Sequence, residues 1–156
     1  MKLLFRQRFM TFPASYDIFD EVGATLYTVE GEFSFGRLMH VRSAGGNYLA
    51  SVKQKAWAWM PTFEIYVGPD YAGRIKKEFS FSGPRYRIEY MGWQVSGDFL
   101  GFDYTVTDAA GNLVAAVSKE LFQLTDTYCI DVADPDNALH ALLLVLAIDA
   151  DKATSS

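Results

Sequence analysis

The sequence predicts a mainly β domain, a closed antiparallel β-barrel wrapped around a buried hydrophobic C-terminal α-helix. The first observation is that residues 138–148 are apolar on every side, interrupted by His140 alone, and such a helix has to be buried. The second is that the residues before it form short alternating segments separated by turn signals, which indicates β-strands. A lone buried helix then needs β-structure around it. We assign residues 1–152 to this single domain and expect residues 153–156 to form a disordered tail.

A turn signal, Asp or Ser followed three residues later by Gly, recurs five times before the helix. The first side chain can hydrogen-bond the backbone of its own turn, and the glycine can take the left-handed conformation that returns the chain as a strand. Alternating segments flank most of these turns, so we expect successive antiparallel hairpins. We interpret the aspartates as turn formers and not as metal or phosphate ligands, because they lack ligand-loop spacing. The five turns are Asp20–Gly23, Ser43–Gly46, Asp70–Gly73, Asp98–Gly101 and Asp108–Gly111.

Residues 74–90 are predicted to form one hairpin in a specific register. A two-residue loop at Ser82-Gly83 places opposite charges across from each other on one face and apolar side chains on the other, and such consistency fixes a register. Arg74, Lys77 and Arg85 are left without an obvious partner. The predicted pairs are Ser80–Arg85, Glu78–Arg87 and Lys76–Glu89 outside, and Phe79–Tyr86 and Ile75–Tyr90 inside.

Residues 53–60 are predicted to form a strand with an unusual face. Alternation puts Lys53, Lys55, Trp57 and Trp59 on one side and small residues on the other. The default interpretation is that a bulge turns the tryptophans into the core or that loops cover them, because most large aromatic side chains serve packing. The alternative is that this face points outward and meets an anionic membrane surface, since Trp prefers the interface and Lys meets head groups.

The start of the C-terminal helix is well specified by its sequence. Asp134 is expected to be the N-cap, with Pro135 at the first helical position and Asp136 near the positive end of the helix dipole. Asp149 and Asp151 suit the other end of the dipole poorly.

The sequence contains no catalytic constellation. It lacks the spacings His-Glu-x-x-His, Cys-x-x-Cys and Gly-x-Ser-x-Gly and a phosphate-binding glycine loop. His140 is expected to be a hydrogen-bonded core histidine, His40 to have a structural role, and Cys129 to be a small strand residue. We therefore predict a protein that is not an enzyme and that uses no cofactor or metal.

Charge and composition limit the partners. A net charge of -5 and a sequence pI of about 4.9 disfavour nucleic acid. A single cysteine excludes an intramolecular disulfide and fits a cytoplasmic location, which we predict. The apolar run of eleven residues is roughly 16 Å long as a helix, too short for a bilayer that needs about 20 residues, so no transmembrane segment is expected. Arg6 and Arg8 interrupt any signal peptide.

Four short motifs follow one another in a recognisable order. They are Tyr16-Asp-Ile-Phe-Asp-x-x-Gly23, Tyr104-Thr-Val-Thr-Asp-x-x-Gly-x-Leu-Val114, Asp126-Thr-Tyr-Cys-Ile-Asp-Val132 and Ala147-Ile-Asp149. This order resembles the LURP-one-related family, within the tubby C-terminal-like superfamily that also includes phospholipid scramblases. The resemblance covers about Leu4 to Lys152 and implies a twelve-stranded antiparallel barrel closed around a hydrophobic C-terminal helix.

The resemblance implies a binding module more than an enzyme. Tubby-like domains bind phosphoinositide head groups through basic residues on the barrel, and residues 47–52 resemble a strand of that region, although the dense basic cluster of those domains is missing here. Two hypotheses follow. The barrel binds anionic lipid or another ligand on its outer surface, or its exposed aromatics form a protein-interaction surface. The residues of the first hypothesis are Arg42, Lys53, Lys55, Trp57, Trp59 and Arg74.

Overall fold

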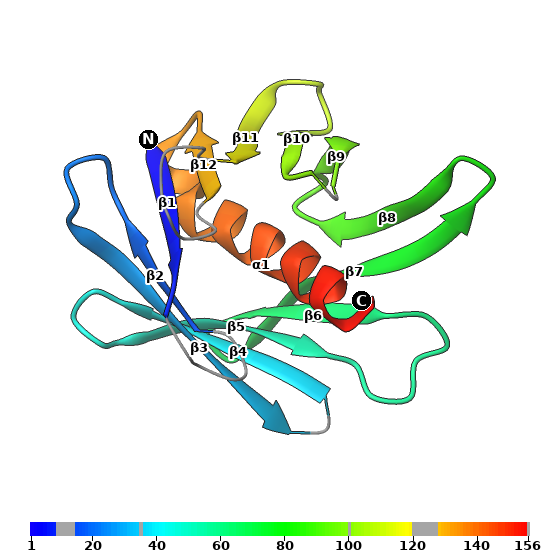
Figure 1. Ribbon diagram of the computed structural model, residues 1–156, viewed down its shortest axis with the longest axis horizontal. Helices are drawn as coiled ribbons and strands as arrows, with labels where there is room; N and C mark the ends of the chain where they lie inside the picture. The colour runs from blue at the N-terminus through cyan, green and yellow to red at the C-terminus, as the bar shows by residue number, and fades with distance from the viewer. Residues whose placement is uncertain (9–14, 35, 100, 120–127, 156) are drawn as a thin grey trace.

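The protein forms one twelve-stranded antiparallel sheet that curls around a single long helix (Figure 1). The computed structural model describes residues 1–8, 15–34, 36–99, 101–119 and 128–155. In chain order the elements are β1 (Lys2–Gln7), β2 (Tyr16–Phe19), β3 (Thr25–Ser34), β4 (Gly36–Ser43), β5 (Tyr48–Gln54), β6 (Thr62–Val67), β7 (Asp70–Ser80), β8 (Gly83–Tyr90), β9 (Gln94–Asp98), β10 (Asp103–Thr107), β11 (Leu113–Lys119), β12 (Tyr128–Val132), the 3-10 helix η1 (Pro135–Asn137) and α1 (Ala138–Ser155).

The strand order shows how the barrel closes. It runs β8-β7-β6-β5-β4-β3-β2-β1-β12-β11-β10-β9, so the first and last strands of the chain pair with each other, with Leu3 opposite Ile130. The two edges of the sheet are β8 and β9, which follow each other in sequence but share no ladder. The predicted antiparallel barrel around a C-terminal helix is confirmed, and it is nearly closed, with one seam between β8 and β9.

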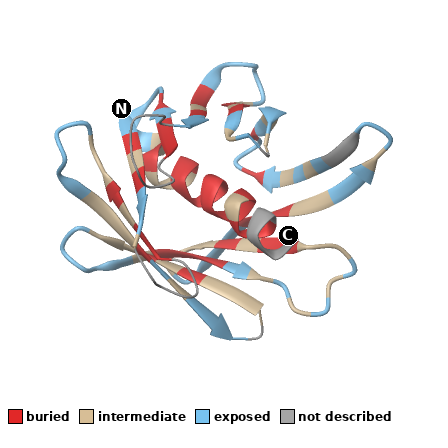
Figure 2. Ribbon diagram, in the orientation of Figure 1, coloured by how far each residue is buried: buried red, intermediate tan, exposed pale blue. Residues whose placement is uncertain are grey.

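Helix α1 fills the interior of the barrel and packs against β5, β6, β7 and β12. Leu142, Leu143, Leu144 and Leu146 are fully buried, and Figure 2 shows most of the helix in the buried class. Each such leucine contributes roughly 2 kcal/mol relative to an exposed position. The inward residues of the strands, such as Ile65 on β6, complete a single core.

The predicted start of the helix is confirmed. Asp134 has an extended backbone, and its carboxylate accepts a hydrogen bond of 3.0 Å from the backbone N–H of Asp136. Pro135 occupies the first position, where its missing N–H is not needed. The helix continues to Ser155, past the residue at which we expected the disordered tail to begin.

Three of the five predicted turns form as expected. Asp20, Ser43 and Asp108 each accept a backbone N–H with their side chain, at 2.8, 3.1 and 2.9 Å, respectively. The backbone N–H of Gly101 also donates to Asp98, at 3.0 Å, although residue 100 of that turn lies outside the described residues.

The predicted turn at Asp70–Gly73 is wrong, because those residues begin β7. The turn is formed by the two residues directly before Asp70, Gly68 and Pro69, and Gly68 has a φ of 57°. Pro fixes its own φ and Gly takes the left-handed conformation, so this pair makes the tighter turn and releases Asp70 into the strand.

The predicted register of the β7–β8 hairpin is wrong by two residues. The loop is Phe81-Ser82, and Arg74 lies opposite Glu89 instead of Lys76. A slip of two residues keeps every side chain on its face, so the facing pattern alone could not distinguish the two registers. The observed register gives Arg74 a hydrogen-bonded ion pair with Glu89 at 2.7 Å. The prediction that Arg74 has no partner is therefore also wrong.

The barrel has two ends with different connections. Neighbouring strands are antiparallel all round, so successive connections alternate between the ends. We call the end where α1 begins the amino end and the end where α1 finishes the carboxyl end. The β5–β6 and β7–β8 connections, the last residue of β3 and the first of β4 lie at the carboxyl end, on the right and lower right of Figure 1.

Candidate functional site

The candidate site is the β5–β6 loop, residues 55–61, at the carboxyl end of the barrel. The predicted strand over residues 53–60 is wrong, because β5 ends at Gln54. Trp57 has a φ of 63°, a left-handed conformation that cannot continue a strand. The base of the loop is anchored: the N–H of Lys55 donates to the carbonyl of Thr62 at 2.8 Å, and the N–H of Lys77 donates to that of Pro61 at 3.0 Å.

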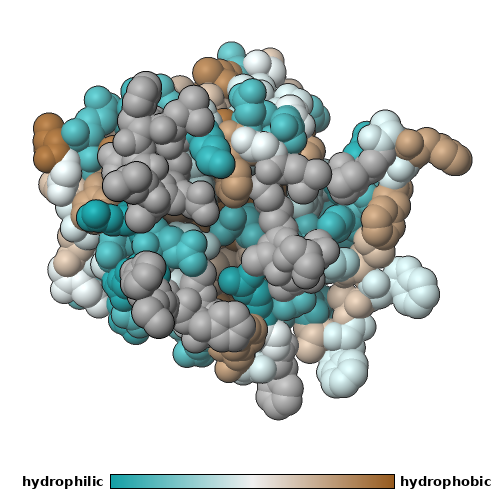
Figure 3. All heavy atoms as spheres, in the orientation of Figure 1, coloured by the Kyte–Doolittle hydropathy of each residue, from teal (hydrophilic) through white to brown (hydrophobic). Residues whose placement is uncertain are grey.

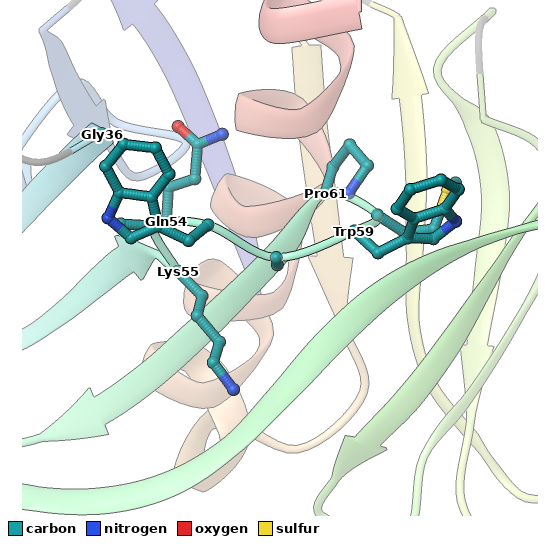
Figure 4. Close-up of a pocket in the computed structure, with 9 residues that line it drawn as sticks. Gly36, Gln54, Lys55, Trp59 and Pro61 are labelled. Carbon is teal, nitrogen blue, oxygen red and sulfur yellow. The ribbon is translucent and has the colours of Figure 1, made fainter.

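The two tryptophans of this loop are exposed to solvent. Trp57 and Trp59 are each 98% accessible, and Figure 4 shows Trp59 directed away from the barrel wall. The default expectation that they pack into the core or are covered by loops is therefore wrong, and the outward orientation is correct. The physical reason is that a loop, unlike a strand, does not have to place alternate side chains toward the core.

Neither the left-handed backbone of Trp57 nor the exposure of its indole helps the isolated domain to fold. A left-handed residue other than Gly costs roughly 1–2 kcal/mol, and an exposed indole gains no burial energy. Strained residues that persist are concentrated at functional sites. We therefore take the β5–β6 loop as the place where this barrel meets something else.

A pocket of about 370 Å³ lies along the loop (Figure 4). Its floor is held by Gln54, whose side-chain oxygen accepts the backbone N–H of Arg37 at 3.0 Å. Lys55 is the charged residue of the lining, and the rest of the lining is neutral. The lining residues are Gly36, Gln54, Lys55, Ala56, Trp57, Ala58, Trp59, Met60 and Pro61.

The structure brings together only part of the predicted ligand-binding set. Lys53 points outward from β5, beside the loop, and lies opposite Glu64 of β6. Arg74 is engaged in the ion pair with Glu89, which raises the pKa of its guanidinium through that hydrogen bond. Arg42 lies near the amino end, where its guanidinium donates to the carbonyl of Gly46 at 3.4 Å. Lys55, Trp57 and Trp59 therefore form the site, with Lys53 next to it.

Two aromatic residues at the same end were missed by the sequence prediction. Phe79 was expected to lie inside, opposite Tyr86, but it is 76% exposed, and Phe81 in the hairpin loop is fully exposed. The β7–β8 hairpin extends beyond the end of α1, so the inner face of its tip has no helix to pack against (Figure 1). The position of Phe81 directly before the turn residues Ser82-Gly83 is the sequence signal that could have predicted its exposure.

Beneath this end, the last turns of α1 form a buried polar cluster with the barrel wall. The hydroxyl of Tyr16 donates to Asp149 at 2.8 Å, and that of Tyr86 donates to Asp151 at 2.5 Å. Lys77, predicted to lack a partner, lies 3.5 Å from the Asp151 carboxylate. Burial and the nearby carboxylates raise the pKa of both tyrosines, so the hydroxyls stay protonated and remain donors. The cluster holds the helix end in place.

The histidines and the cysteine have the expected surroundings. His140 Nδ1 lies 2.8 Å from the Tyr90 hydroxyl, and burial lowers the pKa of His140. His40 lies on β4 with its Nε2 3.4 Å from Glu32. Cys129 is a buried residue of β12. His140 is hydrogen-bonded as predicted, but it is half-buried and does not belong to the core.

Two features are absent from the described residues. No group of three or more His, Cys, Asp or Glu side chains is arranged to hold a metal ion in that part of the chain. Within the same residues, no helix has both the length and the apolar character needed to cross a lipid bilayer.

Comparison with known proteins places the chain in a family. The family model described as LURP-one-related matches residues 1–149. The chain belongs to the LURP-one-related family. It is 26% identical over 150 residues to the uncharacterized protein YxjI of Bacillus subtilis (strain 168), which covers 96% of this chain and 92% of that protein.

A solved structure shows the same fold. A protein from Arabidopsis thaliana, determined by X-ray crystallography, superposes with a TM-score of 0.64 at 14% identity, over 96% of this chain and 91% of that one. The predicted family is confirmed by the family model, and this structure supports the fold. The family description and these two relatives name no reaction and no ligand, so the function has to be argued from the site.

Proposed function

We propose that this barrel binds anionic membrane surfaces peripherally through the β5–β6 loop. In this proposal Trp57 and Trp59 enter the membrane interface and Lys55 contacts acidic head groups. The observation that carries it is a left-handed, 98% exposed Trp57 beside an equally exposed Trp59. Indole rings favour the bilayer interface, where their apolar body is dehydrated while the N–H stays hydrated.

Electrostatics supports an anionic partner at this loop although the whole chain is acidic. Residues 55–61 contain Lys55 and no carboxylate, and each basic residue near an anionic surface contributes about 1 kcal/mol. Lys53 points outward just beside the loop and can add to this attraction. A peripheral domain held by two tryptophans and one or two lysines binds reversibly and is sensitive to salt.

The test is co-sedimentation with phosphatidylcholine vesicles that contain or lack phosphatidylglycerol. The protein is expected to bind the anionic vesicles, and binding should weaken with added salt and with Lys53→Glu/Lys55→Glu. Trp57→Ser/Trp59→Ser should weaken binding by about a hundredfold, with each indole contributing about tenfold. The matched control is Val22→Ser/Leu113→Ser, which removes two exposed apolar side chains from the amino end and should leave binding unchanged.

The outcome against the proposal is also defined. Absence of binding to anionic vesicles at low salt would contradict it. If the protein instead forms a homodimer that Trp57→Ser disrupts, the loop is a protein-interaction surface and the lipid proposal is wrong.

A further inference from the structure

The carboxyl end of the barrel carries aromatic side chains on more than one connection. Besides the β5–β6 loop, the β7–β8 hairpin exposes Phe79 and Phe81, and Phe33 at the end of β3 is 56% exposed. Figure 3 shows apolar side chains projecting on the right from the tip of the β7–β8 hairpin, above the β5–β6 loop. Five exposed aromatic side chains therefore sit on three neighbouring hairpins at the carboxyl end, whereas the exposed Tyr48 and Tyr71 lie toward the amino end.

Charge is distributed unequally between the two ends. The connections of the amino end, residues 20–24, 44–47, 68–69, 91–93, 108–112 and 133–137, are all described and contain five carboxylates and no lysine or arginine. At the carboxyl end, the described parts of the connections contain Arg8 and Lys55 and no carboxylate. Among the described connections, the carboxylates thus lie at the end opposite the β5–β6 and β7–β8 tips.

An anionic surface would orient such a molecule. The acidic end is repelled and the aromatic end is attracted, so both effects favour the same arrangement. The projecting tips come from separate hairpins, and a fluid bilayer can accept each of them without a complementary pocket.

On the basis of the proposed function, we infer that the described tips of the carboxyl end, at the β5–β6 loop, the β7–β8 hairpin and the end of β3, together form the membrane-docking face. The barrel stands on the bilayer with its strands steeply inclined to the surface, with Phe81 and Phe79 of the β7–β8 hairpin inserted beside Trp57 and Trp59. The end of α1 then faces the lipid, and its carboxylates are kept from the anionic surface by their bonds to Tyr16 and Tyr86.

The experiment compares matched variants at the two ends, using the full chain and the same phosphatidylglycerol vesicles. Phe81→Ser should weaken binding about tenfold, whereas Leu113→Ser at the amino end should have no effect. Depth is measured by the quenching of tryptophan fluorescence by brominated lipids. In a Trp57→Phe/Trp59→Phe background, Phe81→Trp should be quenched and Leu113→Trp should not, with the buried Trp93 as a constant background.

Each result decides between one loop and a whole face. If Phe81→Ser binds as the wild type while Trp57→Ser/Trp59→Ser does not, only the β5–β6 loop docks, and the inference fails while the proposed function stands. Equal quenching at positions 81 and 113 would also overturn the inference, because it excludes a single orientation. If the wild type binds no vesicles, both fail together.

Discussion

The two ends of the barrel use different residues to reverse the chain between strands. At the amino end, Asp20, Ser43 and Asp108 bond the backbone of their own turns, and most side chains there serve the fold. At the carboxyl end, the β5–β6 loop places Trp57 in a strained conformation and exposes it. Side chains thus stabilise the turns at the amino end, whereas the β5–β6 loop exposes two indoles. The left-handed Met91 of the β8–β9 connection shows that the exposure of the indoles, and not strain alone, distinguishes the carboxyl end.

Helix α1 links the two ends of the barrel through the core. Leu143→Asp should abolish folding, because an unpaired charge in place of a fully buried leucine costs several kcal/mol, comparable with the whole stability of a domain. Circular dichroism and soluble yield would show this. A folded, soluble variant would mean that the helix lies elsewhere and that the two ends are not defined as we describe.

The polar contacts of α1 differ between the ends, and two matched substitutions measure the difference. Tyr16→Phe removes a hydrogen bond to the Asp149 carboxylate and should lower the free energy of unfolding by about 2 kcal/mol. Tyr90→Phe removes a bond to His140 at the other end and should cost about 1 kcal/mol. Urea denaturation of both variants provides the values. Equal losses would show that the carboxyl end is not held more tightly than the amino end.

Trp57 offers a sharper separation of stability from function. Trp57→Gly relieves the left-handed conformation and should raise the free energy of unfolding by up to about 1 kcal/mol, while vesicle binding falls about tenfold. Denaturant titration and co-sedimentation of the same preparation measure both. A variant that loses stability would show that Trp57 has a role in folding, which would remove the main argument for the site.

The smallest expected effect is the pH dependence that arises at the amino end of α1. Burial lowers the pKa of His140 in the folded state, whereas the unfolded chain keeps a pKa of about 6.5. Below about pH 6.5 the unfolded state therefore binds the proton more readily, and stability should fall as the pH drops toward the folded pKa. In the His140→Gln variant, the urea midpoint of unfolding should change less with pH between about pH 7 and about pH 5.5 than in the wild type. If the urea midpoint of the variant depends on pH as strongly as that of the wild type, another titratable group causes the dependence.

Some features followed from local chemistry and could be predicted. The N-cap at Asp134 and the turns at Asp20, Ser43 and Asp108 depend on atoms within a few residues of each other, so the sequence contains the whole interaction. The buried helix followed from its apolar circumference, because no other environment would accept it. The β-barrel followed from the need to enclose that helix.

Other features depend on contacts between residues far apart in the chain, which local sequence patterns do not reveal. The register of β7 and β8, in which Arg74 lies opposite Glu89, could not be read from the sequence, because a slip of two residues keeps the facing pattern that the sequence displays. Asp149 and Asp151 looked unfavourable at a helix end until Tyr16 and Tyr86 were seen to bond them.

That Lys55, Trp57 and Trp59 would lie close together followed from the sequence alone, since they fall within five consecutive residues. It could not determine on which side of the barrel wall the indoles lie, because alternation fixes a face only while the chain remains a strand. The end of β5 at Gln54 and the left-handed turn at Trp57 removed that constraint. The gathering of these residues with Phe81 at one end was decided by the closure of the sheet around α1.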